Sequence, residues 1–266
     1  MIRAVITGAA GRMGGQLVRL IQETEGIALG AAVERPGHPC VGRDAGEAAG
    51  IGAVGVRVTD ALADALPAGD VVVDFTSAAA SLEHLDVVCR AGKAIVIGST
   101  GFRPDERESV RRRSVEARVF LAPNMSVGVN VLLRMVADVA RLLGDGYDVE
   151  VVETHHRFKK DAPSGTALAL AEAVAAALGR DLAAEAVHGR EGLVGERRPR
   201  EIGLHAVRAG DVVGDHTVLF GGLGERVEIT HRASSRETFA RGALRAALWL
   251  PSQPPGFYTM TDLLGL

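Results

Sequence analysis

Short apolar runs alternate with longer amphipathic stretches through the first half of the chain. The short runs are rich in Val, Ile and Ala and end at Gly or polar residues, which is typical of buried strands, whereas the stretches between them have helical spacing. The predicted strands are residues 2–6, 27–33, 54–58, 71–75, 94–97 and 119–122. The predicted helices are 60–66, 78–91, 104–117 and one that follows Gly14 and ends at about Thr24. Strands that alternate with helices predict a parallel sheet covered on both faces.

The pattern changes after an apolar helix predicted at residues 126–143, which we expect to connect two domains. Strands are predicted at 149–153, 202–207, 216–220 and 226–231, with one main helix at 165–178. This order predicts an α+β domain with a mixed or antiparallel sheet. A charged excursion at 179–201 and a Gly- and Pro-rich loop at 35–51 interrupt the pattern. A helix at 236–250 and a tail with three prolines close the chain.

A glycine-rich turn follows the first predicted strand. Gly8, Gly11 and Gly14 stand between that strand and the next helix, the context in which glycines let backbone N–H groups face a pyrophosphate. Glu34 ends the second strand, where a carboxylate can accept hydrogen bonds from an adenosine ribose, and this favours NAD. The adjacent Arg35 could instead bind the 2′-phosphate of NADP, so both cofactors stay open.

Two further turns follow predicted strands of the same sheet. Gly98-Ser99-Thr100 comes after one strand and Ala122-Pro123-Asn124-Met125 after the next. Ligands of open α/β sheets bind beyond the carboxyl ends of the strands. We therefore expect Gly98 to Thr100 to approach the nicotinamide side of a bound dinucleotide.

A basic stretch carries the candidate chemistry of the second half. His155, His156, Lys159 and Lys160 stand within six residues, although only three of the thirty basic residues are lysines. The next helix is predicted to begin at Ser164-Gly165-Thr166, where unpaired N–H groups and the helix dipole can hold a carboxylate or phosphate. Histidine and lysine are both proton donors, so the stretch places donors beside an anion site.

Composition limits the expected partners and the cellular compartment of the protein. The formal charge of −3 gives no reason to expect nucleic acid or an anionic membrane as a partner. Cys40 and Cys89 lie far apart and in no metal-ligand spacing, so we expect no metal site and a reducing compartment. No secretory signal is visible at the N-terminus, and we expect the protein in the cytoplasm.

Several motifs together resemble one known family. They are Gly8 to Gly14, Glu34-Arg35, Asp74-Phe75-Thr76, Gly98 to Phe102, Asn124 to Asn130, Glu153 to Thr166 and Ser234-Ser235-Arg236. This set is similar to that of the dihydrodipicolinate reductases, also called 4-hydroxy-tetrahydrodipicolinate reductases, and covers nearly the whole chain. Ser77-Ala78 depart from the Arg-Pro that members often have after Asp-Phe-Thr.

The resemblance implies the architecture. It implies an α/β Rossmann-type nucleotide-binding domain, residues 1–126, completed by residues 236–266. It also implies a smaller α+β domain for substrate binding and oligomerisation, residues 127–235, with a hinge between the two. The family further implies NADH or NADPH as cofactor, a small dicarboxylate as substrate and assembly into a homotetramer.

The resemblance also implies residue roles. His155 and Lys159 are the catalytic candidates, and which of them donates the proton stays open. The substrate-binding candidates are His156, Ser164, Gly165 and Thr166. The cofactor-binding candidates are Gly8, Ala9, Ala10, Gly11, Arg12, Met13, Glu34, Arg35, Gly98, Ser99, Thr100, Ala122, Pro123, Asn124, Met125 and Arg236.

The implied reaction is the NAD(P)H-dependent reduction of 4-hydroxy-tetrahydrodipicolinate to tetrahydrodipicolinate, on the diaminopimelate route to lysine. Two other function classes stay open from the residues alone. One is another two-domain nicotinamide oxidoreductase, such as an amino-acid or semialdehyde dehydrogenase, although Cys40 and Cys89 are poorly placed to act as nucleophiles. The other is a dinucleotide-binding redox sensor, which would not need a proton donor beside an anion site.

Overall fold

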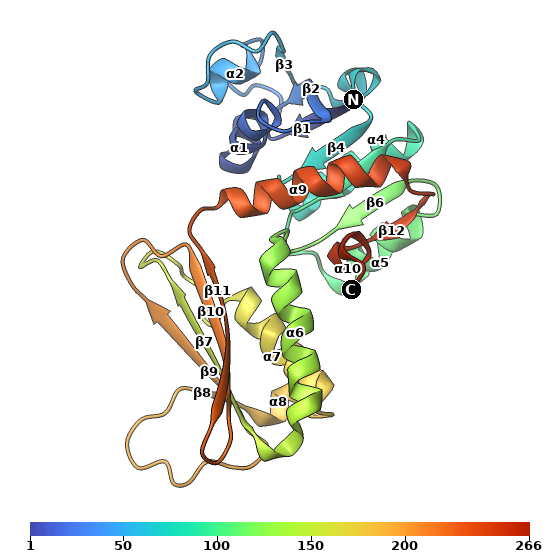
Figure 1. The fold of residues 1–266 in the computed structure, drawn as a ribbon. Helices are drawn as coiled ribbons and strands as arrows, with labels where there is room; N and C mark the ends of the chain where they lie inside the picture. The colour runs from blue at the N-terminus through green and yellow to red at the C-terminus, as the bar shows by residue number, and fades with distance from the viewer. The chain divides into compact units, whose positions relative to one another are not determined.

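The chain folds into two compact units in a computed structural model that describes residues 1–266. The first contains Met1–Ser126 and Glu237–Gly265, and the second contains Val127–Arg236 (Figure 1). The C-terminal segment therefore returns to complete the unit with which the chain begins. None of the helices combines the length and apolar character needed to cross a bilayer.

The first unit is built on one seven-stranded parallel sheet. Its strands run in the order β12-β6-β5-β4-β1-β2-β3, and every neighbouring pair is parallel. They are β1 (Ile2–Thr7), β2 (Ile27–Val33), β3 (Val58–Thr59), β4 (Val71–Asp74), β5 (Ala94–Ile97), β6 (Arg118–Leu121) and β12 (Gly256–Tyr258). The strand order reverses between β1 and β4, which is where sheets of this kind bind their ligands.

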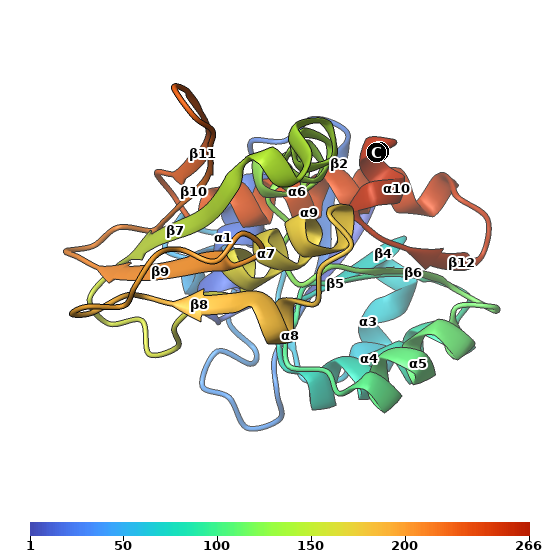
Figure 2. The same ribbon diagram turned by 90° about the horizontal axis from the view of Figure 1, so that it is seen from below.

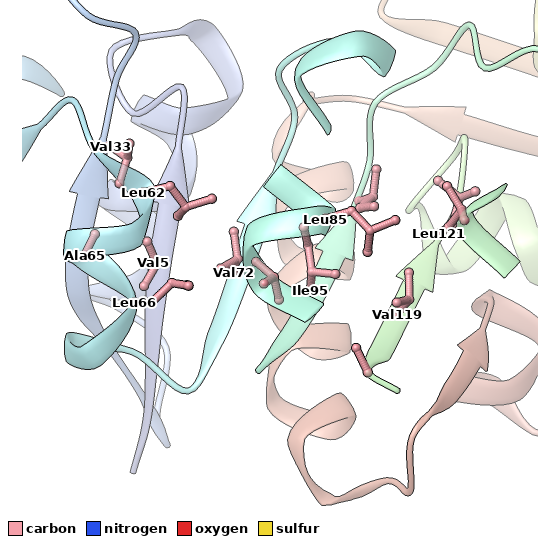
Figure 3. Packing of buried hydrophobic residues seen from close by; sticks show 14 of the residues in the cluster. Val5, Val33, Leu62, Ala65, Leu66, Val72, Leu85, Ile95, Val119 and Leu121 are labelled. Carbon is pink, nitrogen blue, oxygen red and sulfur yellow. The ribbon is translucent and has the colours of Figure 1, made fainter. Parts of the chain in front are cut away.

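Helices cover both faces of this sheet, as the alternating pattern predicts. They are α1 (Arg12–Ile21), α2 (Ala45–Ala48), α3 (Leu62–Ala65), α4 (Ala78–Arg90), α5 (Pro104–Arg113), α9 (Glu237–Trp249) and α10 (Met260–Leu264), with 3-10 turns η1 (Leu66–Ala68) and η3 (Leu250–Ser252). Helices α3, α4 and α5 lie on one side (Figure 2). Val5, Val72 and Ile95 of the sheet pack there against Leu66 and Leu85 (Figure 3).

The predicted strand 54–58 is wrong for all but its last residue. The Asp44 carboxylate accepts hydrogen bonds from the N–H groups of Val54 and Gly55. It also caps the short helix α2, which lies inside the segment 35–51 that the sequence pattern predicts to be a loop. Val54 and Gly55 are therefore held by a carboxylate, Arg57 forms an isolated bridge with Asp44, and β3 starts only at Val58. In the tail, β12 pairs with β6 directly after the prolines.

The second unit has a five-stranded mixed sheet, one of the two arrangements predicted. The order is β11-β10-β7-β9-β8, in which β7, β8 and β9 are parallel and β10 is antiparallel to β7 and β11. The strands are β7 (Asp148–His155), β8 (Ala186–His188), β9 (Ile202–Arg208), β10 (Gly214–Gly221) and β11 (Arg226–Ala233).

Helices cover one face of this second sheet. Helices α6 (Val127–Leu143) and α7 (Gly165–Ala177) pack on it with an apolar core that includes Val151, Leu170 and Val218 (Figure 1). Two short elements complete the unit, the 3-10 turn η2 (Gly144–Gly146) and α8 (Leu182–Glu185). Because side chains alternate along a strand, β7 places Val149, Val151, Glu153 and His155 on the helix-covered side.

The excursion at 179–201 contains α8 and β8, and its remainder is held by ion pairs. Arg190 and Arg197 both bind Glu150 of β7, and Arg190 also binds Glu201. Burial opposes ionisation of Glu150, but hydrogen bonds from Arg190, His205 and Arg197 outweigh it and lower the pKa of the carboxyl to about 2. Arg190 and Arg197 are thereby fixed to the face of the sheet opposite α6 and α7, whereas Leu182 of α8 packs against the core on the helix-covered side.

Candidate active site

The glycine turn, Gly8 to Gly11, connects β1 to α1 and has the geometry that close approach to a phosphate requires. Gly8 has φ +61°, a conformation that L side chains rarely adopt. A Cβ added to Gly14 would lie 2.1 Å from the carbonyl oxygen of Gly8, so only glycine lets α1 pack this closely on the turn. Gly11 caps α1 through its backbone, without a side chain at the helix start.

Glu34 and Arg35 lie beside the glycine turn. The Glu34 carboxylate accepts a hydrogen bond from Ala10 N at 3.2 Å and another from Arg35 N at 3.0 Å. A cleft of about 660 Å³ opens here, lined on one side by Gly8, Gly11, Glu34 and Arg35 and on the other by Thr76 and His84. It spans β1 and β4, where the strand order reverses. Its size and glycine floor fit the adenosine and pyrophosphate of a dinucleotide.

The turns after β5 and β6 offer mainly backbone groups. Ser99 is buried and its hydroxyl accepts a hydrogen bond from Ser81 at 2.8 Å, whereas Thr100 is exposed. Ala122 and Met125 are buried, and the side-chain oxygen of Asn124 accepts a hydrogen bond from Ser126 N at 2.9 Å. Thr100 and Pro123 are exposed, so these turns present mainly main-chain groups and these two side chains to solvent.

The basic turn, His156 to Pro163, follows the end of β7 and is not helical. The backbone N–H of Arg157 donates to the carbonyl oxygen of Gly210, which anchors the turn to the loop between β9 and β10. Lys159 Nζ lies 2.9 and 2.8 Å from the two carboxylate oxygens of Asp161, and this hydrogen bond lowers the pKa of Asp161. Lys160 and Phe158 are exposed.

His155 is the last residue of β7 and is nearly buried, with 9% of its surface exposed. Its Nδ1 lies 2.6 Å from Oε2 of Glu153, a buried carboxylate on the same face of the strand. Arg208 of β9 binds both oxygens of Glu153, at 2.8 and 2.9 Å. Burial opposes ionisation of Glu153, yet the hydrogen bonds from Arg208 and His155 lower its pKa overall.

Ser164 caps α7 from inside the protein. Its hydroxyl accepts a hydrogen bond from Ala167 N at 3.2 Å, lies 3.1 Å from Nε2 of His216, and is buried. The Ser164 N–H donates to Glu153 Oε1 at 3.1 Å. Gly165 is exposed at the helix start, and nothing lies within 4 Å of the place where its Cβ would stand. Of the three substrate-binding candidates at this helix start, Ser164 is buried, whereas Gly165 and Thr166 are accessible to solvent.

Arg236 lies in the second unit and reaches the basic turn. Its Nη2 is 3.2 Å from Nε2 of His156. Burial and the nearby charge of Arg236 both lower the pKa of His156. The structure therefore groups Arg236 with the substrate-binding candidates, and its role at the cofactor stays a prediction.

The sequence pattern singled out none of Glu153, Arg208 and His216 as a functional residue. His216 is buried, and burial followed by repulsion from His155 lowers its pKa to about 4. Glu153 could have been found, because period-two alternation puts it on the face of His155. Arg208 and His216 reach the site only through the pairing of β9 and β10 with β7.

Family models and relatives of known name agree over the whole chain. The model described as dihydrodipicolinate reductase, N-terminus, matches residues 2–125, and the model described as dihydrodipicolinate reductase, C-terminus, matches residues 128–264. The 4-hydroxy-tetrahydrodipicolinate reductase of Anaeromyxobacter dehalogenans (strain 2CP-1) is 58% identical over 266 residues, 100% of this chain and 98% of the relative. The reductase of the same name from Citrifermentans bemidjiense is 54% identical over 100% of both chains.

Solved structures share the fold. A dipicolinate-bound dihydrodipicolinate reductase from Paenisporosarcina sp. TG-14 superimposes with a TM-score of 0.76 at 23% identity, covering 98% of each chain. An amine dehydrogenase from Mycobacterium smegmatis gives a TM-score of 0.62 at 17% identity, covering 97% of this chain and 95% of the other. Because the family models match both units, the chain belongs to the dihydrodipicolinate reductase family.

Proposed function

We propose that this chain reduces 4-hydroxy-tetrahydrodipicolinate to tetrahydrodipicolinate with NADH or NADPH, in the diaminopimelate route to lysine. Relatives at 54 and 58% identity over the full chain carry the name of this activity. The structural observation that carries the proposal is the grouping of His155, Lys159 and the start of α7 around one turn, because a cyclic dicarboxylate needs both anion binding and a proton donor. In the reaction the substrate gains a hydride and a proton and loses its hydroxyl group as water.

The first unit would hold the dinucleotide, which supplies the hydride when bound. Gly8 to Met13 would bind the pyrophosphate through backbone N–H groups at the start of α1. Glu34 would accept hydrogen bonds from the adenosine ribose. Arg35, which is exposed at the cleft, would bind the 2′-phosphate of NADP. Gly98 to Thr100 and Ala122 to Met125 would approach the nicotinamide with their main chain.

The second unit would hold the dicarboxylate. One carboxylate would bind at the start of α7, at Gly165 and Thr166, where N–H groups and the dipole favour an anion. His156 and Lys159 would bind the substrate from the basic turn, with Arg236 beside His156. Lys159 would exchange its partner Asp161, which is 64% exposed, for the substrate.

Proton transfer would come from His155 or Lys159. His155 already has a fixed carboxylate partner, and Lys159 has three N–H donors on a flexible stem. A positioned donor of this kind typically contributes 10²- to 10⁴-fold to a rate.

The test is the oxidation of NADH or NADPH, followed at 340 nm, with freshly prepared 4-hydroxy-tetrahydrodipicolinate. Steady oxidation that depends on this substrate is the expected result. Activity only with an amino acid or an aldehyde would favour another nicotinamide oxidoreductase, and dinucleotide binding without turnover would favour a redox sensor. Comparison of kcat/KM for NADH and NADPH resolves the cofactor preference.

We propose that the assembly is a homotetramer that forms through the second sheet. The face opposite α6 and α7 carries half-buried Val152 and Leu219 and 43%-exposed Val207, apolar side chains that a second copy of the sheet would cover. Light scattering should give about four times the chain mass of 27.8 kDa. A monomer mass would refute this.

We also propose a cytoplasmic location. Both cysteines are unpaired thiols, and the proposed cofactors are reduced nicotinamides of the cell interior. Fractionation of the native cells should recover the protein with cytoplasmic markers, and recovery from the periplasm or the envelope would contradict the proposal.

A further inference from the structure

Glu153 binds four donors from three separate segments of the second unit. Its Oε1 accepts from Ser164 N at 3.1 Å and from Arg208 Nη2 at 2.9 Å. Its Oε2 lies 2.8 Å from Arg208 Nη1 and 2.6 Å from His155 Nδ1. Burying a carboxylate is unfavourable unless it is paired and hydrogen-bonded, and here each of the two oxygens has two donors.

This arrangement determines which nitrogen of His155 carries the proton. An ionised carboxylate is acceptor-only, so Nδ1 of His155 must be the donor to Glu153. Nε2 is then the nitrogen that gains or loses a proton. A Cβ added to Gly214 of β10 would lie 3.0 Å from this Nε2, so the glycine keeps the space beside Nε2 open.

Arg208 keeps the carboxylate in its ionised form. The guanidinium binds Glu153 with two parallel hydrogen bonds, the geometry in which Arg-carboxylate pairs are strongest. The same Arg208 Nη2 donates to the carbonyl oxygen of Asp161 at 2.6 Å, within the basic turn. The Glu153–Arg208 ion pair therefore connects the end of β7 with the basic turn and with Ser164, the residue that caps α7.

We propose that Glu153 is a positioning residue for proton transfer by this enzyme. It fixes His155 as the Nδ1–H tautomer with Nε2 as the working nitrogen, and it fixes the helix start that receives a substrate carboxylate. Arg208 supports it by holding the carboxylate ionised. The inference rests on the proposed function, which places His155 in the substrate site.

The test compares Glu153→Gln with Glu150→Gln in the full chain. Both residues are carboxylates of β7 bound by arginine and histidine, but Glu150 faces the opposite side of the sheet. Histidine-selective ¹⁵N NMR without substrate reports the tautomer of His155, whose signal is assigned by its loss in His155→Gln. Steady-state kinetics with both substrates then separates kcat from KM.

In the wild-type protein we expect the neutral His155 ring as the Nδ1–H tautomer. In Glu153→Gln we expect mainly the Nε2–H tautomer, with kcat lower by roughly 10²-fold or more and the KM of the cofactor unchanged, since loss of an orienting carboxylate acts on kcat. Glu150→Gln should alter neither the tautomer nor kcat.

Three results would overturn the inference. They are an Nε2–H wild-type His155, a folded Glu153→Gln with an unchanged tautomer, and a kcat within threefold of wild type in that variant. The first needs no variant, so the inference stays testable if Glu153→Gln does not fold. The NMR measurement needs no turnover, so failure of the proposed function, seen as wild type without activity, is distinguishable from failure of this inference.

Discussion

The guanidinium of Arg236 lies 3.2 Å from Nε2 of His156, although the two residues are 80 positions apart in the chain. Arginine can only donate, so Nε2 of His156 is the acceptor and the proton of the neutral ring is on Nδ1. Burial and the charge of Arg236 lower the pKa of His156 below its usual 6.5. The Arg236 guanidinium and the acceptor nitrogen of His156 therefore lie where the proposal places an anion.

Dicarboxylate binding should be coupled to proton uptake at His156. The lowered pKa favours the uncharged ring and a nearby dianion favours the charged form, so affinity for dipicolinate should rise as the pH falls toward the lowered pKa of His156. Titration calorimetry in two buffers of different ionisation enthalpy measures the protons taken up. His156→Gln should lose this uptake, whereas His188→Gln, an exposed histidine of β8, should keep it. Equal uptake in His156→Gln would remove His156 from the site.

Lys159 and Lys160 are neighbours with different predicted importance. Lys159 is 20% exposed and bound to Asp161, whereas Lys160 is exposed. Lys159→Ala should lower kcat by roughly 10²- to 10⁴-fold and leave the Kd of NADH nearly unchanged. Lys160→Ala is the matched control and should stay within threefold of wild type. If the two variants behaved alike, Lys159 would have no specific role.

Gly214→Ala should crowd the Nε2 of His155. The added methyl group would lie 3.0 Å from that nitrogen, and Glu153 holds the ring in place. We expect kcat to fall by roughly tenfold, the usual consequence of a small displacement of a catalytic group, with little change in Tm. Gly221→Ala, on the same strand, meets only Leu219 at an ordinary 3.6 Å and serves as the control. Full activity in Gly214→Ala would show that access at Nε2 does not matter.

The glycine turn offers a similar pair of variants. A methyl group at Gly14 would lie 2.1 Å from the Gly8 carbonyl oxygen, which is backbone and cannot give way, whereas one at Gly15 has no neighbour closer than 3.9 Å. Gly14→Ala should weaken NADH binding at least tenfold and lower Tm by several degrees, because the overlap displaces the turn. Gly15→Ala should bind normally. Fluorescence titration and thermal melts decide, and normal binding in Gly14→Ala would argue against a pyrophosphate at this turn.

The sequence pattern predicts an element well where the element's own residues carry the signal. Val71 to Val73 and Ile95 to Ile97 are unbroken apolar runs buried on both faces, so their strands were evident. The predicted strand 54–58 begins too early because the side chain of Asp44, ten residues before Val54, accepts hydrogen bonds from the N–H groups of Val54 and Gly55. The strand after Pro255 was missed because proline usually marks the end of regular structure.

The candidate site also contains residues that the sequence pattern could predict and residues that it could not. His155, Lys159 and Gly165 were accessible to sequence reasoning because they follow one another along the chain. Arg208 contacts Glu153 from 55 residues away, and His216 contacts Ser164 from 52 residues away. Strand pairing between β7, β9 and β10 creates both contacts, and no local pattern specifies that pairing.

The most direct measurement follows the transferred hydrogen itself. The enzyme is incubated with NADH that carries deuterium in both positions at nicotinamide C4, together with freshly prepared 4-hydroxy-tetrahydrodipicolinate, and the product is analysed by mass spectrometry. We predict tetrahydrodipicolinate with one deuterium on carbon from the wild-type protein, and almost none within the same time from a His155→Gln/Lys159→Ala double variant. Product without deuterium, or equal labelled product from the double variant, would contradict the account.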